Sequence, residues 1–133
     1  MRKDIEIPSV ENVTIAIEKS KEAKDELWKV YLINKNDFPL EGTLVSSKGY
    51  GKKDGEEQKT STLRHSLKTV PANGTVVIES IDPAVFHLNN EYWLSYFVEG
   101  KMFDKKFTFV KESIQEKNLT YIKELDAKGI LHS

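Results

Sequence analysis

The chain has 133 residues, a length typical of one domain. Its 20 basic and 21 acidic side chains leave a formal net charge of −1, which argues against a general affinity for nucleic acid or anionic membranes. It has no cysteine, so disulfides, thiolate metal sites and cysteine nucleophiles are excluded, and no apolar run long enough to span a membrane or to serve as a secretory signal. We therefore expect a soluble, cytoplasmic protein.

Apolar and polar side chains alternate in the first part of the chain, as they do in a half-buried β-strand. The segments 13–17 and 40–47 each have one apolar face. The segment 27–34 has apolar side chains on both faces and is therefore predicted to be a central strand. Residues 36–39, Asn-Asp-Phe-Pro, are typical of a turn.

A polar stretch over 47–59 interrupts this alternation. Its three glycines and many charged side chains predict an exposed, mobile loop. Alternation returns over 60–69, where Leu63, His65 and Leu67 share a face, and again over 75–81. The pair Asn73-Gly74 between these two segments predicts a tight turn.

Two aromatic segments, 91–98 and 102–110, complete the strands. In the first, Tyr92, Leu94 and Tyr96 lie on one face, opposite the face that carries Trp93 and Phe97. About seven strands separated by turn signals predict an all-β, antiparallel, immunoglobulin-like sandwich of seven to eight strands over residues 1–111.

The C-terminal region 112–133 has a different pattern. Ser113 and Glu116 match the spacing of a capping box, and Leu119, Ile122 and Leu125 recur at a spacing of three. These features predict an amphipathic helix over 113–128 that ends at Gly129 and extends the same single domain.

No sequence motif predicts catalysis or metal binding. On a strand, Ser66 points away from the neighbouring His65, and Ser61 lies four residues from it, so neither forms a local nucleophile–base pair. His65, His87 and His132 are far apart and lack the spacing of metal ligands. We therefore predict no catalytic residue, no metal and no cofactor.

Phosphate and nucleic acid are also disfavoured as ligands. Residues 48–53, Lys-Gly-Tyr-Gly-Lys-Lys, resemble an anion-binding nest in composition but do not match a phosphate-binding loop. Aromatic and basic residues adjoin at 50–53 and 103–107, yet the chain has only two arginines, Arg2 and Arg64.

Several segments resemble a group of short bacterial proteins of similar length, some of which carry the name phenylalanyl-tRNA synthetase alpha subunit. These segments are 2–8, 28–34, 47–50, 59–65 and 128–131. The chain departs from that name, because a class II synthetase core is much longer and binds ATP through arginines in two separate motifs. The resemblance implies, at most, an accessory partner of an aminoacyl-tRNA synthetase.

The functional prediction is a non-enzymatic module that binds a protein partner through the loop and strand over 47–65. Basic and aromatic side chains meet there outside the core pattern: Lys48, Tyr50, Lys59, Arg64 and His65. Two alternatives stay open. One is a small-ligand or anion-binding protein, or an enzyme whose site joins His65 and His87 from distant strands. The other is a homo-oligomer formed through an edge strand.

Overall fold

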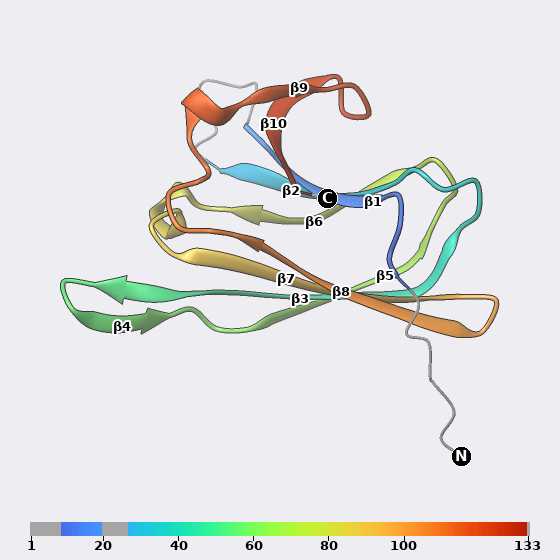
Figure 1. Cartoon of the computed structure of the whole chain (residues 1–133), viewed down its shortest axis with the longest axis horizontal. Helices are drawn as coiled ribbons and strands as arrows, with labels where there is room; N and C mark the ends of the chain where they lie inside the picture. The colour runs from blue at the N-terminus through green and yellow to red at the C-terminus, as the bar shows by residue number, and fades with distance from the viewer. Residues whose placement is uncertain (1–8, 20–26, 133) are drawn as a thin grey trace, which may run out of the picture.

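A computed structural model describes residues 9–19 and 27–132 and shows a sandwich of two antiparallel sheets (Figure 1). Residues 1–8, which carry part of the resemblance, lie outside the described residues. The strands are β1 (Val13–Glu18), β2 (Trp28–Asn34), β3 (Leu40–Lys53), β4 (Glu56–Lys59), β5 (Leu63–Val70), β6 (Thr75–Ile81), β7 (Asn89–Val98), β8 (Lys101–Phe109), β9 (Thr120–Ile122) and β10 (Ala127–His132).

Each sheet contains five of these strands. Sheet A has the order β6-β2-β1-β10-β9, and sheet B has the order β4-β3-β7-β8. Both β4 and β5 pair with the same edge of β3, β4 along its C-terminal part and β5 along its N-terminal part. The prediction of an antiparallel β-sandwich is therefore confirmed. The strand number and order differ from the predicted immunoglobulin-like arrangement, in which sheets of four and three strands pack together.

The core lies between the sheets and is formed by the alternating residues that the sequence pattern predicts. Val30 and Leu32 of β2 face Leu94 of β7 across it, and all three are fully buried. On the other face of β2, Ile33 packs with Ala16 and Ile122 in a second cluster. Strand β2 is thus covered on both faces, as predicted for 27–34.

The predicted C-terminal helix is wrong. Residues 112–132 instead contain a 3₁₀ turn, η2 (Glu116–Asn118), followed by β9 and β10. Ile122 and the nearby Leu125 cover the outer surface of sheet A, so their spacing of three reflects a strand followed by a turn. An isolated helix of this length is marginal in water, whereas β10 gains a ladder of backbone hydrogen bonds along the free edge of β1.

The predicted mobile loop over 47–59 is also wrong, because this stretch belongs to the hairpin of β3 and β4. Asp54 and Gly55 form its turn with φ values of 53° and 81°, the positive angles that a two-residue hairpin turn requires. The hairpin extends past the body of the sandwich (Figure 1). Its charged side chains are typical of a protected sheet edge.

Residues 82–88 cross from sheet A to sheet B through a second 3₁₀ turn, η1 (Pro83–Val85), in which the Asp82 carboxylate accepts the backbone amide hydrogen of Ala84. Within the described residues, no helix has the length and apolar character needed to cross a membrane.

Candidate functional site

The structure places four of the five predicted binding residues on one surface, the outer face of sheet B. Lys48 and Tyr50 point outward from β3, and Lys59 of β4 pairs with Tyr50. Arg64 of β5 pairs with Ser46 on the same face. His65 is the exception: as the next residue along β5, it points toward the interior of the sandwich.

The same face carries large apolar side chains that the sequence analysis did not select. We define the outer B face by Lys48, Tyr50, Lys59, Arg64 and Lys106 together with four exposed apolar residues, Leu44, Trp93, Phe97 and Met102. Trp93 is 48% exposed and Met102 is 53% exposed. A hollow of about 450 Å³ between β3, β5, β7 and β8 is lined by Leu44, Arg64, Trp93 and Met102, among others.

Basic groups dominate the accessible charge of this face. Glu91 is 7% exposed and lies between the ammonium groups of Lys48 and Lys106, each 3.8 Å from its carboxylate. The Lys106 ammonium also lies 4.9 Å from the centre of the Trp93 ring, where the ring quadrupole attracts a cation. Arg64 makes no ion pair with any described residue.

Three further carboxylates lie on the outer B face: Glu57 of β4 is paired in register with Lys52, and the other two have neutral hydrogen-bond partners. Asp104 accepts a hydrogen bond of 3.4 Å from the indole of Trp93. Glu41, at the far end of the face, accepts one of 3.0 Å from Thr69. The surface therefore combines exposed apolar side chains with ammonium and guanidinium groups.

A second cluster lies inside the sandwich and centres on Glu79 of β6. The Glu79 carboxylate is 12% exposed and accepts hydrogen bonds from Ser47 (2.7 Å), His65 (2.7 Å) and Tyr92 (3.0 Å). These donors come from β3, β5 and β7, so a single side chain of sheet A ties three strands of sheet B together. A carboxylate only accepts, so Nε2 of His65 carries the proton in this bond.

A β-bulge directs Glu79 inward. Along β6, Val77 pairs with Tyr31 and Glu79 pairs with Val30, which leaves Ile78 as an extra residue in the ladder. Strict alternation would place Glu79 on the outer face with Val77. The bulge reverses the alternation after Ile78 and turns Glu79 toward the core, on the same face as Val30.

The geometry around Glu79 does not form a nucleophile–base pair. Nucleophilic catalysis requires the serine hydroxyl to donate to the imidazole, but Ser47 and His65 both donate to the same oxygen of Glu79. The other histidine of the alternative prediction, His87, contacts Gln58 of the β3–β4 hairpin at 2.8 Å. In the described part of the chain, no group of three acidic or histidine side chains could hold a metal ion.

Tyr92 gives the Glu79 cluster a pH dependence. Burial, together with the nearby Glu79 carboxylate, raises the pKa of Tyr92 well above its usual value of 10.0. Its contribution to stability is therefore complete below pH 10 and declines at higher pH, where the unfolded chain loses the phenolic proton first. Burial and Glu11 also raise the pKa of Tyr96 to about 12.

We expect the free energy of unfolding to fall above pH 10 by about 1.4 kcal/mol per pH unit for Tyr92, with a further loss from Tyr96. Urea unfolding at a series of pH values would measure this slope. A Tyr92→Phe variant removes one ionising group and should show a shallower decline. Equal slopes for the two proteins would contradict the assignment.

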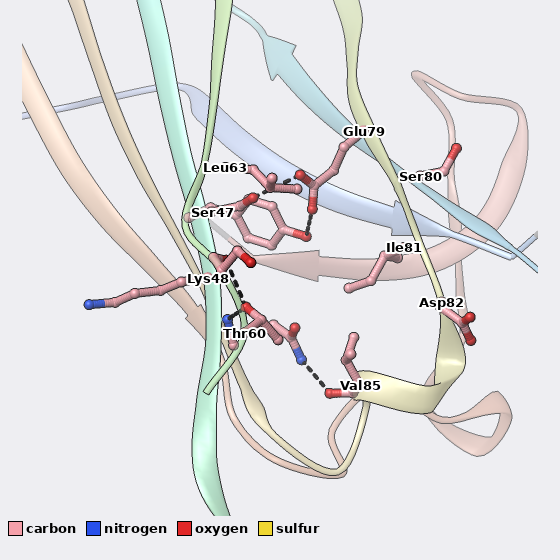
Figure 2. Close-up of a pocket in the computed structure, with 13 residues that line it drawn as sticks. Ser47, Lys48, Thr60, Leu63, Glu79, Ser80, Ile81, Asp82 and Val85 are labelled. Carbon is pink, nitrogen blue, oxygen red and sulfur yellow. Dashed lines mark hydrogen bonds between the residues drawn. The ribbon is translucent and has the colours of Figure 1, made fainter. Parts of the chain in front are cut away.

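A pocket of about 260 Å³ opens beside Glu79, where β3 and β6 diverge (Figure 2). Glu79, Ser80, Ile81 and Asp82 line one side, and Ser47, Lys48 and Gly49 line the other. Thr60, Ser61, Leu63, Val85, Asn90 and Tyr92 complete it. Figure 2 shows Lys48 extending away from the pocket. Neither His65 nor His87 lines this space.

No protein-family model matches the chain, and no curated protein sequence matches it. The outer B face and the pocket beside Glu79 are the features of the structure that bear on function.

Proposed function

We propose that the protein is a non-enzymatic interaction module that binds an acidic segment of a partner protein on the outer B face. The supporting observation is the group of exposed apolar side chains, Leu44, Trp93, Phe97 and Met102, on the same sheet face as the basic groups of Lys48, Arg64 and Lys106. Contiguous exposed apolar surface with a polar rim marks interaction sites more often than it marks ordinary surface. Tryptophan and arginine, both present here, are the residue types enriched in binding hot spots.

The charge of the face favours an acidic partner. The chain as a whole is slightly negative, yet the accessible charged groups around Trp93 are mainly basic: the ammonium groups of Lys48 and Lys106 and the guanidinium of Arg64, against the single carboxylate of Asp104. The carboxylate closest to both lysines, Glu91, is buried beneath them. An acidic segment with apolar side chains would complement both features of this surface.

The exposed edge of β8 is less suitable for binding another strand. Strand β8 lies at an edge of sheet B and carries Lys105 on the face that it shares with the core residue Phe107, with the ammonium 4.9 Å from that ring. A charged side chain on the inner face of an edge strand opposes the addition of another strand. We therefore do not propose a homo-oligomer formed through β8.

We keep the cytoplasm as the proposed location, since a chain without cysteine gains no disulfide from an oxidising compartment. An aminoacyl-tRNA synthetase, implied by the resemblance of the sequence, is one partner that a direct binding assay can include.

Selection from a phage library of random peptides tests the proposal without a choice of partner in advance. The recovered peptides should be rich in aspartate, glutamate and large apolar residues. Their affinity should fall by about 30-fold in Trp93→Ala and in Arg64→Ala, the loss typical of a hot-spot residue. Affinity should also weaken with added salt.

Tyr121→Ala is the matched control, because Tyr121 is an exposed aromatic residue of sheet A, away from the outer B face. It should leave peptide affinity unchanged, and all three variants should keep the melting temperature of the wild type. Recovery of basic peptides, or binding that is insensitive to Trp93 and Arg64, would refute the proposal.

A further inference from the structure

The exposed apolar and basic side chains of the outer B face are separated along the direction of β3. Leu44 of β3, Phe97 of β7 and Met102 of β8 are each between 41% and 53% exposed, and Phe97 pairs with Met102. We call these three residues the apolar end of the face. The turn that joins β7 to β8 closes the sheet beside them (Figure 1).

The basic end of the face lies on the hairpin that extends past the sandwich at the opposite end of β3 (Figure 1). Lys48, Tyr50 and Lys52 occupy alternate positions along β3 and are exposed, and Lys59 of β4 pairs with Tyr50. We define the basic end by Lys48, Lys52 and Lys59. Lys52 and Lys59 make no ion pair with any residue that the structure describes.

A row of paired residues joins the two ends. Arg64 of β5 pairs with Ser46 of β3, Ser46 pairs with Trp93 of β7, and Trp93 pairs with Lys106 of β8. The hollow of about 450 Å³ lies on the apolar side of this row, since Leu44 and Met102 line it. None of the three lysines of the basic end lines the hollow.

The charges on the face follow the same division. Glu41 and Asp104 lie at the apolar end, the first paired with Phe97 and the second two residues after Met102 on β8. The lysine beside them, Lys68, is at a bulge of β5. In the joining row and the basic end, the basic residues outnumber the glutamates: Lys48, Lys52, Lys59, Arg64 and Lys106, against Glu57 and Glu91.

We infer that the partner segment is bipartite, with one continuous block of large apolar residues followed or preceded by one continuous block of acidic residues. The apolar block lies over the apolar end, with one side chain in the hollow, and the acidic block lies over the basic end. This inference rests on the proposed function and adds the order of residues within the bound segment.

The dimensions and the charge of the face support this order. Leu44 and Lys52 are eight residues apart on β3, so the face is about 26 Å long at the usual rise of a strand, and an extended segment of similar length covers it. A segment in which acidic and apolar residues alternate would place carboxylates beside Glu41 and Asp104, where like charges repel.

Two peptides of identical composition test the order. In the block peptide the acidic residues are continuous and the apolar residues are continuous, and it is made in both chain directions. In the interspersed peptide the two kinds of residue alternate. In titration calorimetry at low salt, the better block peptide should bind at least about tenfold more tightly than the interspersed one, because only it avoids like-charge contacts.

A spin label on the block peptide tests its placement. The label is attached to one end of the peptide and then to the other, and the ¹⁵N-labelled protein is followed by two-dimensional NMR. A label on the acidic end should broaden the amide signals of residues 52–59. A label on the apolar end should broaden those of residues 97–102.

A double variant tests the basic end. Replacing Lys52 and Lys59 together with alanine should weaken the block peptide about fivefold, the effect expected of two exposed charge pairs, and should change the interspersed peptide much less. The matched control replaces Lys29 and Lys128, two exposed lysines of sheet A, with alanine and should leave both affinities unchanged.

The outcomes separate this inference from the proposed function. Equal affinities of the block and interspersed peptides, or broadening at the opposite ends of the face, would overturn the inference alone if Trp93→Ala still weakens binding. If no peptide binds, or if Trp93→Ala binds each peptide as the wild type does, the proposed function fails and the inference fails with it.

Discussion

Replacing Glu79 with alanine is expected to lower the free energy of unfolding by about 4 kcal/mol, because three hydrogen-bond donors lose their acceptor at once. Of these donors, Tyr92 is 1% exposed and Ser47 is 5% exposed, so bulk water does not readily replace the hydrogen bond that each of them loses. Unpaired buried polar groups typically cost about 1–3 kcal/mol each. The same carboxylate also ties β6 to β3, β5 and β7.

Urea unfolding followed by tryptophan fluorescence would measure this loss, and thermal unfolding should show a melting temperature lower by about 10 °C for a chain of this length. Glu57→Ala is the matched control, since Glu57 is an exposed glutamate on β4, and it should change stability by less than about 0.5 kcal/mol. A loss below about 1 kcal/mol in Glu79→Ala would mean that the cluster does not hold the two sheets together.

The features that the sequence predicts well are those that depend on alternation within one strand. In β7, Tyr92, Leu94 and Tyr96 are buried, and Trp93 and Phe97 lie on the opposite face, as the pattern of 91–98 predicts. Such a pattern specifies the face of each side chain but not whether another element covers that face. The sequence therefore predicts which residues of β7 share the outer B face, but it does not predict that this face is exposed.

The features that the sequence analysis missed depend on contacts between distant segments. The inward position of Glu79 results from a bulge in the pairing of β6 with β2. The residues around Ile78 carry no local signal that predicts this bulge. The hairpin turn at Asp54 and Gly55 did have a local signal, because Asp-Gly is a preferred hairpin dipeptide. The high charge of the surrounding stretch outweighed that signal in the prediction.

The C-terminal region shows the same limitation most clearly. Leu119, Ile122 and Leu125 fit a helical period, and Gly129 fits the residue that ends a helix. In the folded chain, Gly129 instead lies in β10, paired with Glu18 of β1 and with Thr120 of β9. Glycine permits close approach of two backbones in a sheet, and it also commonly ends a helix. The residue type alone therefore does not distinguish these two roles.

Gly129→Ala is accordingly expected to destabilise the protein by about 3 kcal/mol, the upper part of the usual range for overpacking. A Cβ atom at this position would lie 2.6 Å from the carbonyl oxygen of Ile17 and 3.0 Å from Cδ1 of Ile122. The first of these atoms belongs to the backbone of β1, so relief requires β10 to move away from its partner strand. Where the backbone accepts alanine without a clash, the same substitution stabilises by about 0.4–1 kcal/mol. The sign of the change in the free energy of unfolding therefore shows whether the clash is present.

Gly51→Ala is the matched control for this prediction. Its Cβ atom would lie 3.2 Å from Cδ2 of Leu88, a terminal methyl group that can move aside, so the change in stability should stay within about 1 kcal/mol. Urea unfolding would compare the two variants, and hydrogen exchange should show faster exchange of the β10 amides in Gly129→Ala alone. Because β10 is the only strand joining β9 to the rest of the described sheet A, its loss would also release Ile122 from Ala16 and Ile33. A stabilised Gly129→Ala variant would contradict the placement of β10 against β1.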